Sequence, residues 1–370
     1  MSAIRFLHAA DLHLDSPFEA LRSGKAAVRR SEQRMLLQRM VELVHREQLQ
    51  LVLLPGDLLD SDLSYAETGE ALCSCFRQMA VPVVIAPGNH DWYSAHSPYE
   101  RLPLPENVHV FTKNDIESVT LPSLGVRIYG AAYTGRESPS LLPGFRAAVG
   151  DGLLNLLCLH GEVTRQDSPY APIREEELAA SGLHYAALGH IHKASGLRRA
   201  GGTWYSWPGC PEGRGFDECG EKTVSIVELS DTDCRLRPVS IALRRYEILR
   251  VNITGSDPLL AVHSQLSDDT AKDIYRIILS GEVDSPPDLT RLQQNLDELF
   301  YALQLRDETR LRQNVWDKAG EDSLRGLFLK KLRAAAETAS PEQRQLIEQA
   351  ARWGLAALDH REEVIVHDHS

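Results

Sequence analysis

The chain lacks a long apolar segment: no run of about 18 apolar residues occurs, so nothing in it is expected to span a membrane. The N-terminus has no basic region followed by an apolar core, which argues against a secretory signal. None of the six cysteines forms a Cys-x-x-Cys pair, and 370 residues are enough for a stable core without disulfides. We therefore expect free thiols in a reducing, cytoplasmic protein.

An excess of positive charge is also missing. The formal net charge is −12, which argues against a protein that coats nucleic acid through an overall positive field. It does not exclude a local basic strip. It also suits an acidic site that holds divalent cations, because these ions cancel part of the charge.

Short apolar runs alternate with helical patterns at the start of the chain. We predict strands over 4–9, 51–54 and 81–85, and helices over 31–46 and 65–79. Ser31 is expected to cap the first helix. This order indicates βαβ units with parallel strands.

Strand patterns then dominate up to about residue 245. They cover 108–111, 118–121, 126–129, 153–159, 185–188, 203–206, 223–229 and 235–242. Because helices are rare there, we predict a second sheet packed on the first. The expected fold class is α/β, a two-sheet α/β sandwich over residues 1–245.

Two further parts are expected after this domain. Residues 246–310 alternate strand and helix patterns, which indicates a small α/β module. Residues 311–370 contain two amphipathic helices. The second helix opens with Ser340-Pro341-Glu342-Gln343, a capping box with proline at the first helical position.

Polar clusters follow five of the predicted strands. They are Asp11-Leu12-His13, Gly56-Asp57-Leu58-Leu59-Asp60, Gly88-Asn89-His90-Asp91, Leu159-His160-Gly161 and Gly189-His190-Ile191-His192. Each motif alone is common in turns, but five in this order, each after an apolar strand, are not expected by chance. Sites in α/β sheets assemble where strands end, so we expect the side chains to meet. The glycines are expected to let the backbone turn beside them.

The clusters supply seven candidate metal ligands: Asp11, His13, Asp57, Asn89, His160, His190 and His192. Carboxylate, amide and imidazole groups together suit Mn²⁺, Fe²⁺, Co²⁺ or Zn²⁺. Seven ligands are too many for one tetrahedral ion. Two ions that share a bridging carboxylate fit better, and Asp57 is the natural bridge.

The set of motifs resembles that of the calcineurin-like metallophosphoesterase superfamily. Within it, Gly56-Asp57-Leu58-Leu59-Asp60 and residues 6–15 and 205–218 are similar to SbcD-type DNA repair exonucleases. The resemblance covers residues 4 to about 245 by motif and the remainder only by layout. It implies a metallophosphoesterase fold with a capping domain over 246–310 and a C-terminal helical region over 311–370.

The resemblance also implies a role for each site residue. One metal would be held by Asp11, His13, Asp57 and His192, and the other by Asp57, Asn89, His160 and His190. His90 would be the acid that protonates the leaving oxygen, and Asp60 would orient it. Mn²⁺ is the metal we expect.

The implied activity is hydrolysis of DNA phosphodiester bonds in repair, by exonuclease or endonuclease cleavage. A phosphate track is one interpretation of the cations Lys25, Arg29, Arg30, Arg34 and Arg39, and a solvated helix face is the other. Base stacking is one interpretation of Trp204, Tyr205 and Trp207, and packing is the other.

Three alternatives remain open. A small-molecule phosphodiesterase acting on cyclic nucleotides would use the same site, but it leaves the residues after 245 unexplained. A phosphoprotein phosphatase would carry arginine after Asp60, where this chain has Ser61. A binding subunit would dock its C-terminal helices on an SbcC-type, SMC-like ATPase, unless those helices only pack on each other. A homodimer is a further possible assembly.

The remaining polar residues receive simpler interpretations. His8 is expected to be a packed core histidine. Asp15 and Asp91 either support the metal ligands or only shape turns. His96 and His184 are expected in solvated loops, and a tail with His367 and His369 is expected to be loose.

Overall fold

The computed structural model describes residues 3–18, 21, 23–61, 65–267, 269–312 and 315–358. The chain forms two compact units. The first comprises Met1–Leu249, Leu266–Ile278 and Gln293–Arg306, and the second comprises Arg250–Gln265, Leu279–Leu292 and Asp307–Ser370. The three-part division drawn from the sequence stays a prediction. Within the described residues, no helix combines the length and apolarity needed to cross a membrane.

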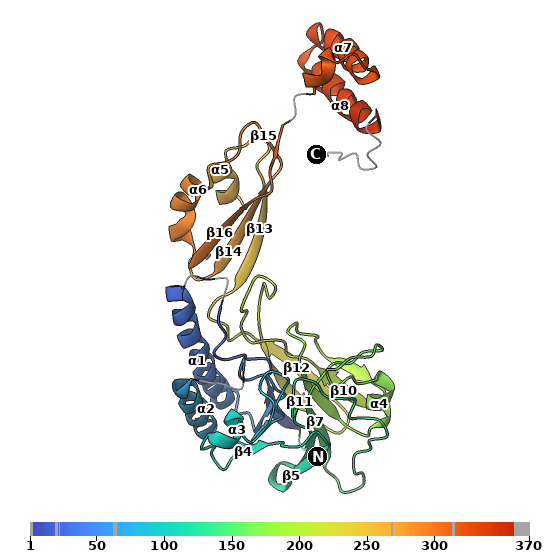
Figure 1. Ribbon diagram of the computed structural model, residues 1–370. Helices are drawn as coiled ribbons and strands as arrows, with labels where there is room; N and C mark the ends of the chain where they lie inside the picture. Colours follow the sequence, from blue (N-terminus) through green and yellow to red (C-terminus); the bar gives the residue numbers. More distant parts are fainter. Residues whose placement is uncertain are drawn as a thin grey trace. The chain divides into compact units, whose positions relative to one another are not determined.

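The first sheet has the strand order β12-β11-β1-β2-β3-β4. Its strands are β1 (Ile4–His8), β2 (Leu51–Leu54), β3 (Val83–Ile85), β4 (Val108–Val110), β11 (Val224–Leu229) and β12 (Cys234–Val239). β1 to β4 run parallel to one another, as βαβ units require. β11 runs antiparallel to both of its neighbours, β1 and β12. Helices α1 (Ser23–Arg46) and α2 (Ala66–Met79) lie side by side (Figure 1).

The start of α1 differs from the prediction. The helix begins at Ser23, so Ser31 lies inside it and is not its cap. The eight residues before Ser31 include alanine, lysine and arginine, which favour helix, and Ala26 and Arg29 are buried. Helix-favouring residues and the burial of Ala26 and Arg29 therefore explain why α1 begins eight residues before the start predicted from its apolar pattern.

The second sheet has the order β5-β6-β7-β8-β10-β9. Its strands are β5 (Glu117–Leu121), β6 (Val126–Gly130), β7 (Leu154–His160), β8 (Tyr185–Gly189), β9 (Arg198–Ala200) and β10 (Thr203–Ser206). β6, β7, β8 and β10 run parallel. The short helix α3 (Pro98–Arg101) lies between β3 and β4 of the first sheet. The 3-10 turn η1 (Pro122–Leu124) lies between β5 and β6, and helix α4 (Glu175–Ala180) lies between β7 and β8.

The predicted two-sheet sandwich is confirmed by a core that both sheets share. Phe6 and Leu53 of the first sheet belong to the same buried cluster as Ile128 and Leu156 of the second. Burial of a phenylalanine such as Phe6 is worth about 3–5 kcal/mol against alanine. This packing fixes both sheets and therefore the loops that leave them.

Three strands expected in the second sheet belong to the first instead. They are the segments predicted over 108–111, 223–229 and 235–242, observed as β4, β11 and β12. β11 pairs antiparallel with β1, with Ile4 opposite Leu229. Five of its six residues are buried, which suits a strand inside a sheet with both faces covered.

A three-stranded sheet, β13-β14-β16, follows in the chain. Its elements are β13 (Tyr246–Asn252), α5 (Pro258–His263), β14 (Ile274–Ser280), α6 (Leu289–Leu296), η2 (Asp297–Leu299) and β16 (Ala302–Asp307). β15 (Glu282–Val283) pairs with β17 (Arg310–Leu311) in a separate two-stranded ribbon.

Two amphipathic helices close the described chain, after the 3-10 turn η3 (Asp317–Gly320). α7 (Leu324–Glu337) is capped by the Ser323 hydroxyl, which accepts a hydrogen bond from the Gly326 N–H at 3.1 Å. The capping box predicted for α8 (Pro341–Leu358) is confirmed, because Ser340 and Gln343 exchange bonds of 3.2 and 3.3 Å.

Candidate metal centre

The five polar motifs lie where β1, β2, β3, β7 and β8 end, as predicted. Main-chain bonds tie the first two loops together: the Asp11 N–H donates to Gly56 O at 3.1 Å, and the His13 N–H donates to Asp57 O at 2.9 Å. The side chains after β1 and β2 are therefore held in register by the backbone, not by their own contacts alone.

Four of the seven predicted ligands have backbones in the left-handed region. Their φ values are 54° at Asp11, 44° at His13, 52° at Asp57 and 92° at His190. Residues with a Cβ adopt this region rarely and at a cost, and such strain concentrates at functional sites. The fold thus maintains an unfavourable backbone at the positions that carry the polar side chains.

Two glycines are required by close approach. Gly56 has φ 85°, and a Cβ there would lie 2.5 Å from His160 Nδ1. A Cβ on Gly88 would lie 2.2 Å from Asp57 Oδ1. Glycine is therefore required at both positions, and the expectation that it lets the backbone turn beside the ligands is confirmed at Gly56, whose φ is left-handed.

The Nε2 atoms of His13 and His192 face each other, while each Nδ1 faces a carboxylate. His13 Nδ1 lies 3.0 Å from Asp60 Oδ1, and His192 Nδ1 lies 2.6 Å from Glu218 Oε1. Carboxylates only accept, so each Nδ1 carries the proton and each Nε2 of a neutral ring has a lone pair. The two Nε2 atoms are 3.1 Å apart, and although burial opposes it, the bond to Glu218 raises the pKa of His192. A proton therefore holds the two nitrogens together where no metal is bound, and a metal ion that both nitrogens bind would replace that proton. Carboxylate-bound Nδ1 with a free Nε2 is the arrangement of a metal-ligating histidine.

His160 repeats this arrangement with a backbone carbonyl. Its Nδ1 donates to Pro55 O at 3.0 Å, which leaves the lone pair on Nε2. That nitrogen faces Asn89 Oδ1 at 2.9 Å and Asp57 Oδ2 at 3.4 Å. Three acceptor atoms therefore converge on one place, again as a cation requires.

Both aspartates are buried, and one oxygen of Asp11 lacks a donor from the part of the chain that the structure describes. Asp11 is 0% exposed; its Oδ1 accepts the His190 N–H at 2.9 Å, while its Oδ2 has no hydrogen-bond partner within the described residues. Burial raises the pKa of Asp11 to about 7, with His192 opposing and Asp57 adding to the shift. Burial likewise raises the pKa of Asp57 to about 6. Buried carboxylates held this way are normally paired with cations.

Three groups of side chains offer ligand atoms that all lie within 4.8 Å of one another. They are Asp11, His13 and His192; Asp11, Asp57 and His160; and His13, Asp57 and His90. The first two groups contain only predicted ligands. His190 belongs to none of the three, and its ring packs between His160 at 5.2 Å and Tyr170 at 4.8 Å.

His90 lies at the edge of this cluster. Its side chain is 43% exposed, and Nδ1 is 3.3 Å from Asp60 O and 3.9 Å from Asp60 Oδ1. The Asp60 carboxylate lies closer to His13 than to His90, at 3.0 Å. The main-chain carbonyl of Asp60 is therefore the nearer partner of the proposed acid.

The sequence did not single out Arg214 and Glu218. Arg214 Nη1 lies 3.0 Å from Asp60 Oδ1, and Nη2 lies 2.9 Å from Glu218 Oε1. The arginine thus joins the two carboxylates that hold His13 and His192. Although burial opposes ionisation, the bonds from His192 and Arg214 keep the pKa of Glu218 well below its usual range. Both residues stand in the quoted stretch 205–218, but no local pattern marks them as partners of the site.

Asp91 supports the ligand loops, as one of its two interpretations predicted. It is 0% exposed and accepts backbone N–H groups from Asp57 (3.2 Å), Leu58 (2.7 Å), Leu59 (3.2 Å) and Gly88 (2.8 Å). It also accepts the Tyr99 hydroxyl at 2.5 Å. One carboxylate therefore fixes the loops after β2 and β3 relative to each other.

The other histidines and Asp15 lie outside the cluster. His8 is buried in the core between Tyr185 Oη (3.0 Å) and Leu188 O (3.1 Å), as predicted. Asp15 accepts from Thr68 and Tyr65 at the start of α2. His184 accepts the Asn155 N–H, and His96 is exposed in a loop. His367 and His369 lie outside the described residues.

Both interpretations of the α1 cations, a phosphate track and a solvated helix face, are wrong for Arg29. That side chain is 0% exposed and pairs with Glu32 at 2.7 Å and Glu212 at 3.1 Å. Its neighbours also make internal contacts: Arg39 donates to main-chain carbonyls of 241 and 242, Lys25 to Tyr301 O, Arg30 to Pro17 O, and Arg34 lies 3.9 Å from Asp15.

Base stacking is wrong for two of the three aromatic residues proposed for it. Tyr205 is 1% and Trp207 5% exposed, and Trp207 donates to the carbonyls of Gly161 and Gly189. Trp204 is half-buried beneath the Arg199 guanidinium, 4.7 Å from its ring centroid. These rings pack the second sheet instead.

Comparison with known proteins agrees with this geometry. The sequence profile described as calcineurin-like phosphoesterase matches residues 4–194. An uncharacterized metallophosphoesterase of Bacillus subtilis, YhaO, is 29% identical over 343 residues, covering 85% of this chain and 81% of the relative. The SbcD component of the nuclease SbcCD of Bacillus subtilis is 26% identical over 265 residues, covering 61% and 66%.

A crystal structure of a dimetal phosphatase from Danio rerio is similar with a TM-score of 0.42 at 13% identity, over 65% of this chain and 100% of that one. The family match contains all five motifs, and the donor set they bring together fits divalent metal ions. Since the match spans more than half of the sequence, the chain belongs to the calcineurin-like phosphoesterase family and is a metal-dependent hydrolase of phosphoesters.

Proposed function

We propose that this chain hydrolyses phosphodiester bonds of DNA with two divalent metal ions, of which Mn²⁺ is the preferred one. The observation that carries the proposal is the half-exposed His90, which stands beside the buried donor cluster and lines a cavity of about 730 Å³. A positioned acid is needed where the leaving group is a poor one, as a sugar alkoxide is.

The two proposed ligand sets share Asp57. Asp11, His13, Asp57 and His192 would hold one ion, and Asp57, Asn89, His160 and His190 the other. When bound, ions at these positions supply Lewis-acid chemistry, neutralising phosphoryl charge and making water a stronger nucleophile. The convergent lone pairs of His13, His192 and His160 support this arrangement.

The residues of the chain would then direct the proton. Because His90 Nδ1 faces Asp60 O, Nε2 is the nitrogen left to donate. The water oxygen would bond to phosphorus as the bond to the leaving oxygen breaks. Nε2 would give its proton to that leaving oxygen, and the proton that the water loses would pass to solvent. Arg214 holds the Asp60 carboxylate from the other side and so keeps this loop in place.

DNA is the proposed substrate because one relative is named as part of a nuclease and is similar over 61% of this chain. A cyclic-nucleotide phosphodiesterase is the second candidate, since the same site would serve it. Ser61 stands where a phosphoprotein phosphatase is expected to have arginine, which argues against that class.

The test is an assay of Mn²⁺-dependent cleavage. End-labelled double- and single-stranded DNA would be compared with bis-p-nitrophenyl phosphate and cyclic nucleotides. Cleavage of DNA is the expected result. Hydrolysis of the small diesters or cyclic nucleotides without any cleavage of DNA would refute the nuclease assignment and leave the hydrolase assignment intact.

We also propose that α7 and α8 dock on the coiled coil of an SMC-like ATPase. Leu324 and Leu327 of α7 are 73% and 58% exposed, and Leu346 and Trp353 of α8 are 65% and 43% exposed. Other apolar residues of the pair, such as Leu329 and Ala351, are already buried between the helices. Co-purification with such a partner should be lost on deleting residues 311–370; retention would contradict the proposal, and a homodimer in its place would favour self-association.

A further inference from the structure

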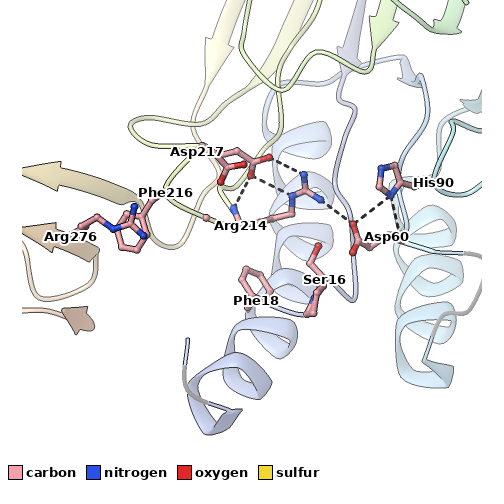
Figure 2. A pocket seen from close by; sticks show the side chains of 11 residues that line it. Ser16, Phe18, Asp60, His90, Arg214, Phe216, Asp217 and Arg276 are labelled. Atoms are coloured by element: carbon pink, nitrogen blue, oxygen red, sulfur yellow. Dashed lines mark hydrogen bonds and ion pairs between the residues drawn. The ribbon is translucent and has the colours of Figure 1, made fainter. Parts of the chain in front are cut away.

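The cavity beside His90 has two different ends. Figure 2 shows His90 and Asp60 at one end and the stacked pair Phe216 and Arg276 at the other, with Arg214 between them. Its volume of about 730 Å³ is in the range of sites that enclose a ligand of a few hundred daltons. The cavity is lined by Asp60, Arg214 and Glu218, which hold His13 and His192, and by His90, which lies next to His13 and Asp57. It therefore opens directly beside the candidate metal ligands.

The position of His90 tells which part of a substrate would enter. This step rests on the proposed function, in which His90 protonates the leaving oxygen. Whatever is attached to that oxygen must lie close to His90. Since His90 lines the cavity, the cavity is the space available for the leaving half of a phosphodiester.

Two contacts fix the Arg276 side chain at the end of the cavity opposite His90. Its guanidinium lies 4.0 Å from the centroid of the Phe216 ring, and its Nε donates to Gln304 Oε1 at 2.6 Å. Phe216 is in turn held edge-on by the buried Tyr246, at 5.1 Å and 87°. A planar cation stacked on a supported ring loses little further freedom when it binds an anion.

The charge of Arg276 is not compensated. No carboxylate of the described residues lies within 4.0 Å of its guanidinium nitrogens, in contrast to Arg214, which pairs with Asp60 and Glu218. Burial and the repulsion of Arg306 lower the pKa of Arg276, and a bound anion would offset that repulsion. Arg214 is committed to the metal-supporting carboxylates, and Arg276 is left as the cation of the cavity that is open to a ligand.

We propose that Arg276 is a specificity-determining residue that binds the phosphate next to the scissile one, on the leaving side of a nucleotide chain, while the leaving nucleoside occupies the cavity. The arginine fork suits a phosphate because it offers several N–H donors to its oxygens. The α1 cations that could have lined a phosphate track make contacts within the protein instead. Arg276 would therefore take their place as the residue that binds a phosphate of the substrate, on the leaving side.

The test uses matched dinucleotides that differ by one phosphate. TpT is compared with pTpT and TpTp, which carry the extra phosphate at either end and so cover both directions of cleavage. The unmodified protein should show a kcat/KM about 10- to 100-fold higher for one of the phosphorylated forms, the effect of a hydrogen bond to a charged group. Arg276→Ala should reduce this ratio to about one, and Arg276→Lys should keep part of it.

Arg235→Ala is the matched control. Arg235 is an exposed arginine of β12 that forms an ion pair with Asp233 and does not line the cavity, so its loss should leave the ratio unchanged. Melting curves establish that each variant is folded, and Arg276→Gln replaces Arg276→Ala if the latter is not. Equal ratios in the unmodified protein and the Arg276 variants would overturn the inference but leave DNA cleavage standing. Failure of the unmodified protein to cleave any of the nucleotides, or longer DNA, would instead refute the proposed function.

Discussion

Glu218→Gln tests whether the support of the metal ligands extends beyond the motifs. The carboxylate lies 2.6 Å from His192 Nδ1 and pairs with Arg214, and its side chain is 6% exposed. Glutamine keeps the shape and removes the charge. It can still accept from His192, but it polarises the imidazole less and leaves Arg214 with one carboxylate.

Substitution of a group that holds a metal-ligating histidine lowers metal affinity about 10- to 100-fold. This corresponds to about 1.4–2.8 kcal/mol of binding free energy. Because Glu218 touches only His192 among the proposed ligands, the loss should fall on one of the two ions. The Asn89 and His160 end of the cluster has its own support from Pro55 and should retain its affinity within about threefold.

Calorimetric titration of the metal-free protein with Mn²⁺ measures both affinities. Glu221→Gln is the control, since it makes the same chemical change three residues away on an exposed side chain. Thermal unfolding of the metal-free forms shows that each variant is folded. If Glu218→Gln bound both ions as tightly as Glu221→Gln does, the series of contacts from Asp60 through Arg214 and Glu218 to His192 would have no part in metal binding.

Three further predictions concern the acid, the loops and a charge network. His90→Asn should lower turnover of DNA about 10²- to 10⁴-fold, as measured by steady-state kinetics, while elemental analysis shows unchanged metal content. Asp91→Asn should lower the free energy of unfolding in urea by about 2–4 kcal/mol, because the amide cannot accept all the N–H groups that the carboxylate accepts. Glu32→Gln should lower stability at pH 7 and have less effect near pH 3. Although burial opposes it, bonding to Arg244 and Arg29 lowers the pKa of Glu32, so its contribution is complete above the ordinary value of about 4.3 and is lost as the pH falls through the folded-state pKa.

Each of these has a matched control and a contradicting result. For His90, a p-nitrophenyl diester needs no proton at its leaving group, so an equal loss on both substrates would contradict the acid role. For Asp91, Tyr99→Phe removes one of its bonds and should cost about 1 kcal/mol; an equal cost for both would contradict the account of the loops. For Glu32, a parallel drop at all pH values would show that packing, not charge, is lost.

The sequence could predict the parts of the site that depend on local order. Asp11, Asp57 and His190 follow short apolar strands, and the loop after a strand is fixed by neighbouring residues and glycines. The spacing of the motifs therefore predicted which side chains meet. It could also predict the two-sheet class, since alternating strand and helix patterns are local properties.

The features that the sequence could not predict depend on contacts between residues far apart in the chain. Arg214 reaches Asp60 across 154 positions of the sequence, and no periodicity marks such a pair. Arg29 was expected to be exposed because arginines usually are, but Glu32 and Glu212 make its burial possible. β11 was assigned to the wrong sheet because its pairing with β1 depends on the tertiary fold. Patterns along one segment do not contain this information.

We propose that seven side chains bind two divalent ions and that Asp57 lies between the ions. Crystals of the protein grown with Mn²⁺ and measured at the manganese absorption edge test it directly. We expect two anomalous peaks about 3.5–4 Å apart, one beside the Nε2 atoms of His13 and His192 and one beside His160 Nε2. A single peak, or peaks away from Asp57, would contradict it.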